Sequence, residues 1–432
     1  MLQVLGSAWA LLIGIFLLMI GNGLQGSLIG IRGAIENFST AELSVITSAY
    51  FAGFLFGSKL APELIRRVGH VRVFAALGSL VSAVLILYPT VTEPWAWIVL
   101  RVIFGFSFSG LYVTAESWLN NASENKNRGK ALSLYVIAQM AGIVTAQGLL
   151  NVADPAGYVL FIIPSVLVSL SFAPILLTVT ATPAFETTKP MSLIELYRIS
   201  PLGFIGLFLL GTIFAAQFGM SSVYGTQAGF SVAEISAFVS AIFLGGLLMQ
   251  YPIGWLSDRM DRRILICAAA VTGGFAGIVG WMSGDQYEVV LIVAFVLGGV
   301  SNPLYALLLA YTNDYLSSED MAAASGGLLF VNGCGAVLGP ILTGWMMTEI
   351  GPGGFWIYLS LFMFLMAAYA GYRMTQRRSL YAEESDYDAV PYAPLPMTVT
   401  SVAVEAAQEY YAENVDTGEE ESDDDTEVFD RE

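Results

Sequence analysis

Two long apolar runs flank the stretch Gly254-Trp-Leu-Ser-Asp258-Arg259-Met-Asp261-Arg262-Arg263. The stretch is too short to form a domain, and it places acids and arginines where one apolar run ends and the next begins. This pattern predicts a tight hairpin between two helices at a membrane surface. An earlier stretch has the same design, Pro62-Glu-Leu-Ile-Arg66-Arg67-Val-Gly69-His70-Val-Arg72. Two such hairpins in corresponding places predict a duplicated membrane protein.

The composition of the chain agrees with a membrane protein. Of its 432 residues, 56% are hydrophobic and only 12% are charged, whereas the surface of a soluble domain of this length needs more charge. Apolar runs of about 18 or more residues recur along the chain, which predicts membrane-spanning helices. Transmembrane β-strands would instead show short segments of alternating hydrophobicity. We therefore predict an all-α polytopic membrane protein.

The negative net charge belongs to the end of the chain. The total is −17, but residues 379–432 contain 17 of the 35 acids and one of the 18 bases. The rest of the chain is nearly neutral, with 17 bases and 18 acids. Residues 379–432 have few apolar side chains, so we predict a disordered tail that acts as a solvated, solubilising segment. A regulatory or partner-binding role for this tail is the alternative.

The apolar runs divide the chain into two sets of six spans. We place the spans at about 5–30, 42–66, 71–90, 95–119, 129–151, 157–180, 201–226, 234–257, 263–282, 287–313, 321–348 and 354–375. The predicted units are an N-terminal six-helix bundle (1–180), a cytoplasmic linker (181–200), a C-terminal six-helix bundle (201–378) and the acidic tail (379–432). In the linker, Ser192-Leu-Ile-Glu195 predicts a short capped surface helix.

The basic residues predict the orientation. With the N-terminus inside, fifteen bases before the tail lie at the cytoplasmic ends of the spans, and only Arg32 and Arg101 lie on the other side. This asymmetry follows the positive-inside rule. We expect a multi-pass protein of the plasma (bacterial inner) membrane with both termini in the cytoplasm.

Polar side chains inside the spans predict an internal cavity. Asparagine and glutamine are costly in a membrane unless they face protein or water, and the third, sixth, ninth and twelfth spans have none in their interiors. This pattern suits two bundles around a central aqueous cavity. For any single amide, a hydrogen bond between helices is the alternative. The residues that we assign to a substrate cavity are Asn22, Gln25, Arg101, Gln139, Gln217, Gln250, Asn302 and Asn332.

Few charged residues remain as candidates for coupling transport to an ion gradient. Arg101 lies inside the fourth span, Glu116 lies fifteen residues further on, and Asp314 ends the tenth span. For the two acids, structural ion pairing is the alternative, and for Arg101 it is snorkelling. His70 is the only histidine, and we expect it to be a hairpin loop residue without a special role.

Several motifs resemble a known transporter family. The pattern Gly254-xxx-Asp258-Arg259-x-x-Arg262-Arg263 resembles the loop signature of the major facilitator superfamily, with Asp261 in place of its second glycine. Arg66-Arg67-x-Gly69 keeps half of this signature, and Arg101-Val-Ile-Phe-Gly105 resembles the family's motif in span 4. The combination of Glu116-Ser117, Asn127-Arg128-Gly129 and Gly142-xxxx-Gln147 is similar to the YcaD-like branch of bacterial transporters.

The resemblance implies twelve transmembrane helices and alternating access, in which two bundles rock about a central site. It also implies that hairpin charges form a cytoplasmic gate. Because the first hairpin lacks the family's acid, we hypothesise that Arg66 or Arg67 pairs with acids at the start of span 11. The predicted gate residues are Arg66, Arg67, Gly69, Arg128, Gly254, Asp258, Arg259, Arg262, Glu319 and Asp320.

The function predicted from these observations is secondary active transport of a small polar or amphipathic solute, driven by a proton or solute gradient. An enzyme is not expected, because one histidine and two isolated cysteines provide neither a nucleophile with its base nor a metal site. The alternative is a non-transporting sensor or scaffold that acts through the acidic tail. We expect a monomer in the lipid bilayer, with no cofactor, no metal and no nucleic-acid partner.

Overall fold

A computed structural model describes residues 2–122, 128–177, 191–284 and 286–376, together with Thr400 and Val404. The first half of the chain forms six long helices. They are α1 (Leu2–Ile35), α2 (Thr40–Val68), α3 (His70–Leu87), α4 (Pro94–Ala122), α5 (Arg128–Leu149) and α6 (Val159–Leu177).

The second half begins with a short helix, α7 (Leu193–Ile199), at the predicted linker position. Its N-cap Ser192 accepts a hydrogen bond from the Glu195 backbone N–H at 3.2 Å, and Leu196 is buried. The helices that follow are α8 (Pro201–Gly219), α9 (Ser221–Gln227), α10 (Val232–Ser257), α11 (Arg262–Met282), α12 (Tyr287–Asn313), α13 (Ser318–Ile350) and α14 (Gly354–Gln376).

The predicted all-α membrane fold is confirmed. Within the described ranges, ten helices are long and apolar enough to cross a membrane, and two shorter apolar segments lie in α5 and α6. The predicted seventh span differs in detail, because it is divided into α8 and α9 at Met220. The Ser221 hydroxyl donates to the Gln217 carbonyl at this break.

Helices α2 and α10 begin in the same way. Ser39 and Glu42 form a capping box at α2, and Ser231 and Glu234 form one at α10. In each box the serine oxygen accepts from the glutamate backbone N–H while the carboxylate accepts from the serine backbone N–H. The surrounding residues repeat as Phe-Ser-x-Ala-Glu at 38–42 and 230–234. This repeat is a second sign of duplication, independent of the hairpins.

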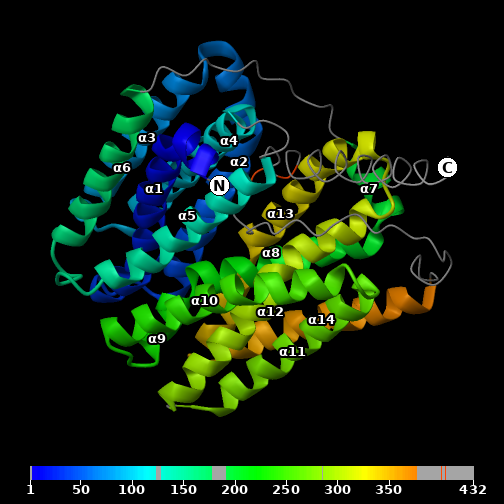
Figure 1. The fold of residues 1–432 in the computed structure, drawn as a ribbon. Helices are drawn as coiled ribbons and strands as arrows, with labels where there is room; N and C mark the ends of the chain where they lie inside the picture. Colours follow the sequence, from blue (N-terminus) through cyan, green and yellow to red (C-terminus); the bar gives the residue numbers. More distant parts are fainter. Residues whose placement is uncertain are drawn as a thin grey trace, which may run out of the picture.

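The helices form two bundles that meet along α1, α2 and α5 on one side and α9, α10 and α13 on the other (Figure 1). In the first bundle, α2 packs on α4, and α1 packs on α5 and α6. In the second, α10 packs on α12 and α8 on α13. Figure 1 shows α3 and α6 at the outer edge of one bundle and α11 and α14 at the outer edge of the other. These are the four spans that lack interior amides.

Close packing of α2 on α4 explains the glycine of the span 4 motif. A Cβ atom at Gly105 would lie 2.0 Å from the Tyr50 carbonyl oxygen, which no side chain could tolerate without moving the backbone. Any larger residue at position 105 would therefore separate the two helices. The glycine thus positions Tyr50 and the α2 face that carries it.

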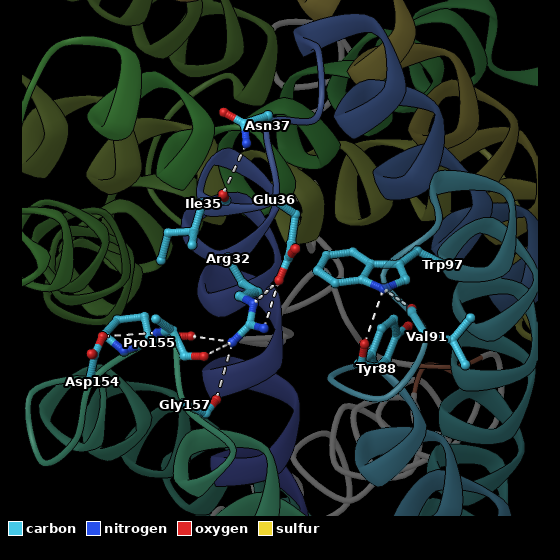
Figure 2. Close-up of polar contacts among 11 residues, drawn as sticks. Arg32, Ile35, Glu36, Asn37, Tyr88, Val91, Trp97, Asp154, Pro155 and Gly157 are labelled. Atoms are coloured by element: carbon cyan, nitrogen blue, oxygen red, sulfur yellow. Dashed lines mark hydrogen bonds and ion pairs between the residues drawn. The ribbon is translucent and has the colours of Figure 1, made fainter.

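One end of the first bundle is held by Arg32, near the C-terminus of α1. Its guanidinium pairs with Glu36 at 2.6 Å and donates to the carbonyl oxygens of Pro155, Ala156 and Gly157, in the connection between α5 and α6 (Figure 2). The indole N–H of Trp97 donates to the Val91 carbonyl at 2.8 Å in the same region. We call this the opposite end, because the two hairpins lie at the other end of the helices, which we call the hairpin end.

Candidate functional site

A pocket lies between the two bundles. It contains about 540 Å³ of space not occupied by atoms, part of it open to solvent. The first bundle contributes one face of α2, and the second contributes faces of α8 and α13. The lining residues are Tyr50, Phe51, Phe54, Leu55, Ser58, Phe214, Phe218, Leu329, Asn332, Gly333 and Ala336.

Aromatic side chains from both bundles form the wall of this pocket. Tyr50 of α2 stacks on Phe218 of α8, with ring centroids 6.0 Å apart and an interplanar angle of 26°. Phe51 meets Phe214 and Phe218 edge-on, at 6.4 and 6.2 Å. Aromatic rings make offset and edge-to-face contacts of this kind with one another, and they can make the same contacts with a planar apolar ligand. The arrangement can therefore bind the apolar part of a small molecule between the bundles.

Among the eight residues predicted to line a cavity, Asn332 is the one that lines this pocket in the described part of the chain. Its amide nitrogen donates to the Leu207 carbonyl at 3.0 Å, so its oxygen remains the available polar atom beside the pocket. Ser58 adds a hydroxyl nearer the hairpin end. These groups would orient the polar part of a guest.

The other predicted amides are not among the residues that line the pocket. Asn22 donates to the Tyr112 hydroxyl at 3.1 Å, Gln217 accepts from Ser301 at 2.9 Å, and Asn302 donates to Gly298 in its own helix at 3.0 Å. Gln139 is fully buried and Gln250 is half-buried. Asn22 joins α1 to α4 in the first bundle, and Gln217 joins α8 to α12 in the second.

Arg101 lies one layer behind the pocket. It is almost fully buried, and its guanidinium donates to the Gln25 side-chain oxygen. The guanidinium carbon also lies 5.1 Å from the centre of the Tyr50 ring. Through this cation–π contact Arg101 supports the side chain that lines the pocket. Its Nε and the Tyr88 hydroxyl have no hydrogen-bond partner among the described residues.

The bundles are joined by hydrogen bonds between the pocket and the opposite end. Ser48 donates to the Val337 carbonyl, Gln227 donates to the Thr40 hydroxyl, and Ser236 donates to the Gln147 carbonyl. Gly344 is in close contact with Ser44, because a Cβ atom there would lie 2.3 Å from the Ser44 Cβ. The pocket is therefore closed toward the opposite end.

Sequence comparison places this architecture in a family. The family model described as Major Facilitator Superfamily matches residues 11–242 and 203–396. The chain belongs to this superfamily. Membership of this superfamily and the all-helical membrane fold support a membrane transporter.

Two curated relatives of this superfamily member carry the name "Uncharacterized MFS-type transporter YcaD". The protein from Escherichia fergusonii is 24% identical over 359 residues, which cover 82% of this chain and 92% of the relative. The protein from Escherichia coli O6:K15:H31 is 26% identical over 360 residues, with the same coverage. The resemblance to the YcaD-like branch is confirmed.

Solved structures have the same fold. The nucleoside transporter NupG matches with a TM-score of 0.69 at 13% identity, covering 85% of this chain and all of that one. Its D323A mutant matches with a TM-score of 0.71 at 16% identity, covering 84% of this chain and 99% of that one. At this identity the likeness concerns the fold alone.

The signature hairpin of this transporter is built on Arg262, the first residue of α11. Arg262 is buried, and its guanidinium pairs with Asp314 at the end of α12. It also donates to the Ser257 hydroxyl at 3.1 Å and lies 3.6 Å from the Asp258 carboxylate. Asp261, where the family signature has glycine, caps α11 by accepting from the Arg263 backbone N–H at 2.9 Å.

Arg259, Gly254 and Gly69 are three further predicted gate residues of the hairpins, and their surroundings differ. Arg259 is exposed and lies 4.3 Å from the centre of the Trp255 ring. Gly254 is buried near the end of α10, and Gly69 has a positive φ of 84° between α2 and α3. A positive φ is costly for residues other than glycine, so the tight turn requires Gly69.

The first hairpin is arranged differently. Arg66 and Arg67 are exposed, and both pair with Glu63 of the same helix at 2.6 Å. The expectation that His70 is a loop residue is wrong. His70 begins α3, is 2% exposed, and its Nε2 lies 2.9 Å from the Ser117 hydroxyl of α4. It is buried because α3 begins directly after Gly69 and places its first turn against α4.

The acids at the start of α13 are only partly described. Asp320 is exposed and accepts from the hydroxyl of the N-cap Ser317 at 2.7 Å. The side chains of Arg128 and Glu319 lie outside the described residues. The pairing proposed for Arg66 or Arg67 with Glu319 and Asp320 stays a prediction.

Glu116 and Asp314, the two acids considered for coupling, have different surroundings. Asp314 is bound to Arg262. Glu116 is 1% exposed and accepts from the Tyr135 hydroxyl of α5 at 2.8 Å and from the Thr400 backbone N–H at 3.0 Å. No group of three or more potential metal ligands occurs in the ranges that the structure describes.

Proposed function

We propose that this chain is a secondary transporter that carries a small amphipathic solute by alternating access. The observation that carries the proposal is the pocket between the two bundles. Its aromatic wall comes from both bundles, and polar groups at Asn332 and Ser58 sit beside that wall. A site shared in this way changes its exposure when the bundles rock against each other.

The pocket favours a solute with a planar apolar part. Tyr50, Phe51 and Phe218 already make stacked and edge-on contacts with one another, so a ring of similar size can replace part of these contacts. The few polar groups then fix its orientation, as in most small-molecule sites. We place the pocket opening toward the cytoplasm, since the hairpin end carries most of the bases.

A proton is the simplest coupling ion for this arrangement. Arg262 already compensates the charge of Asp314. Glu116 is buried and bonded to a hydroxyl and a backbone N–H, so protonation there would alter contacts at the hairpin end. We therefore assign the coupling role to Glu116 before Asp314 and Arg101.

The test is a binding screen followed by flux. Purified protein is screened against metabolite and drug panels by thermal shift, because a bound ligand raises the unfolding temperature. The flux of each compound that binds is then measured in proteoliposomes with and without a pH gradient. We expect uptake that depends on the gradient and is reduced in Glu116→Gln.

Two phenylalanines on α2 provide a matched pair for the binding site. Phe54 lines the pocket, whereas Phe56 is 59% exposed on the outside of the bundle. Phe54→Leu should weaken binding of the hit about tenfold, the loss of one well-packed aromatic contact. Phe56→Leu should bind as the wild type does. Equal affinities for the two variants would place the binding site elsewhere.

The predicted gate at the start of α13 has its own test. Neutralising both acids, in Glu319→Gln with Asp320→Asn, should weaken closure at the hairpin end and reduce the outward-open population. Accessibility of cysteines placed at the opposite end measures this population. An unchanged population would show that Arg66 and Arg67 do not use these acids.

A further inference from the structure

Three buried hydrogen-bond donors around Arg101 lack an acceptor. The Arg101 guanidinium donates one hydrogen bond, to the Gln25 side-chain oxygen, and its Nε has no partner. The Gln25 amide nitrogen and the Tyr88 hydroxyl are also without a partner among the described residues, and both side chains are fully buried. Tyr88 is within electrostatic reach of both Arg101 and Gln25. A carboxylate or a similar anion only accepts hydrogen bonds, so it is the group that suits these donors.

The positive charge of Arg101 has no acidic partner in the part of the chain that the structure describes. Arg101 lies seven residues after the start of α4, which corresponds to about 10 Å along the helix axis, and it is 1% exposed. An unpaired charge at such a position is costly, and charged residues inside membrane spans mark sites for substrates and ions. Arg262, the buried arginine of the second hairpin, has Asp314 as its acid. Arg101 therefore has both the charge and the donors for an anionic ligand.

Arg101 is separated from the pocket by one aromatic ring. The guanidinium carbon lies 5.1 Å from the centre of the Tyr50 ring, and Tyr50 lines the pocket. Close packing holds the two helices together here, since a Cβ atom at Gly53 of α2 would lie 2.1 Å from the Val102 carbonyl oxygen of α4. The Tyr50 side chain is therefore the partition between Arg101 and the pocket.

The surroundings of the pocket also favour a negative solute. None of the residues that line it in the described chain is charged. A second cation lies beside it, where the Lys59 Nζ is 3.9 Å from the centre of the Phe330 ring of the other bundle. Lys59 directly follows the lining residue Ser58, and Phe330 directly follows the lining residue Leu329. A positive charge at this place raises the local concentration of anions.

We infer that the solute of this transporter is a planar organic anion, whose negative group binds the Arg101 guanidinium, the Gln25 amide and the Tyr88 hydroxyl while its ring occupies the aromatic pocket. A change in the Tyr50 rotamer admits the negative group, and the ring of the solute replaces the contact between Tyr50 and Phe218. The polar end is then bound in the first bundle and the apolar end between the bundles, which fixes the orientation of the solute. This inference rests on the proposed function, because it names the class of solute that the pocket takes.

The first test compares two probes of nearly the same shape, naphthoate and naphthamide. Their affinities for purified full-length protein in detergent are measured by calorimetry. Naphthoate should bind at least about tenfold more tightly than naphthamide, because only the carboxylate can pair with the charge of Arg101. Arg101→Gln keeps an amide donor beside Gln25 but loses the charge, and it should remove this preference, whereas Arg101→Lys should keep part of it. Absence of naphthoate binding, or equal affinities of the two probes, would overturn the inference.

Two tyrosines provide a matched pair of controls. The hydroxyls of Tyr88 and Tyr358 are both buried without a partner among the described residues, but Tyr358 lies on α14 of the second bundle. Tyr88→Phe should reduce the preference for naphthoate about threefold, the loss of one hydrogen bond, and Tyr358→Phe should leave it unchanged. Arg72→Gln removes an exposed charge from α3 and should leave it unchanged too. Equal effects of Tyr88→Phe and Tyr358→Phe would overturn the assignment of this site.

The second test distinguishes the solute from a free inorganic anion. Thermal unfolding of the full chain is followed in chloride and in gluconate, each with and without naphthoate. Naphthoate should raise the unfolding temperature in both salts, because it binds the folded state. If the two probes bind equally while chloride raises the unfolding temperature of the unsubstituted chain but not of Arg101→Gln, the site holds an inorganic anion and the inference is overturned.

Both tests measure binding without a gradient, so they are independent of the proposed transport. Naphthoate that binds but is not carried in proteoliposomes would contradict the proposed function and leave the anion site standing. Gradient-driven flux of a neutral or cationic solute, together with equal affinities of the two probes, would overturn the anion site and leave the transport proposal standing.

Discussion

The two hairpins of this transporter occupy equivalent places but use different chemistry. The residue that begins α3 is His70, and it bonds to Ser117 of α4 at 2.9 Å. The residue that begins α11 is Arg262, and it pairs with Asp314 at the end of α12. In each bundle the first residue after the hairpin is buried and bonded to the next helix along the chain. The neutral pair of His70 and Ser117 joins two helices of the first bundle, and the charged pair of Arg262 and Asp314 joins two helices of the second.

The hairpin arginines make different contacts in the two bundles. In the second hairpin the signature arginine is buried and joins three helices, through Ser257 of α10 and the Asp314 carboxylate. In the first hairpin the arginines are exposed and bind only Glu63 among the described residues. The hydrogen bond of His70 has taken over the joining role. The hairpin arginines of the first bundle pair with Glu63 of their own helix and take no part in that joining contact.

The charged pair should be the most sensitive point. Asp314→Ala removes the closer of the two acids beside the buried Arg262 and should lower the free energy of unfolding by about 3–5 kcal/mol. Denaturant unfolding in detergent measures the loss. Glu288→Ala removes an exposed acid at the other end of the same helix and should change little. Equal losses for the two variants would contradict a special role for the pair.

Removing the hydrogen bond between His70 and Ser117 should lower the free energy of unfolding by a smaller amount. His70→Ala deletes one partner of a buried hydrogen bond and should lower the free energy of unfolding by about 1–3 kcal/mol. Combining it with Ser117→Ala in a double-mutant cycle isolates the contribution of the contact. Strictly additive effects of the two substitutions would mean that this hydrogen bond does not join α3 to α4.

The exposed pair in the first hairpin should matter least for stability. Glu63→Gln removes an acid whose partners are 69% and 71% exposed, and such surface pairs contribute little. We expect the same unfolding midpoint as the unsubstituted chain at both low and high salt. A clear drop in the midpoint at low salt would show that the first hairpin depends on its charges as the second does.

The fold could be predicted from the sequence because long apolar runs and the distribution of bases follow directly from the membrane environment. The pocket could not. Phe54 and Phe56 lie two residues apart in one apolar run, yet one lines the pocket and the other is exposed. Only the packing of α2 against α8 and α13 decides between them. Asparagine and glutamine residues marked buried positions better than apolar residues did. Most of these amides, however, join helices within one bundle and do not line the pocket.

Contacts between distant parts of the chain could not be predicted from the sequence either. His70 and Ser117 are 47 residues apart, and neither belongs to a motif that predicts the other. Glu116 and Thr400 are 284 residues apart, and the acidic composition of the tail predicted a solvated segment. The repeated Phe-Ser-x-Ala-Glu pattern at 38–42 and 230–234 was available in the sequence and would have supported the duplication more directly than the hairpins.

Alternating access requires the two bundles to move against each other about the pocket, and the distance between Thr40 and Gln227 tests this movement most directly. Their side chains are hydrogen-bonded across the bundles at the opposite end. Spin labels at these two positions, in a chain without Cys267 and Cys334, report this distance by pulsed electron resonance in nanodiscs. We predict two populations, one at contact distance and one longer, whose ratio changes with a bound solute or with pH. A single population at contact distance under every condition would contradict alternating access.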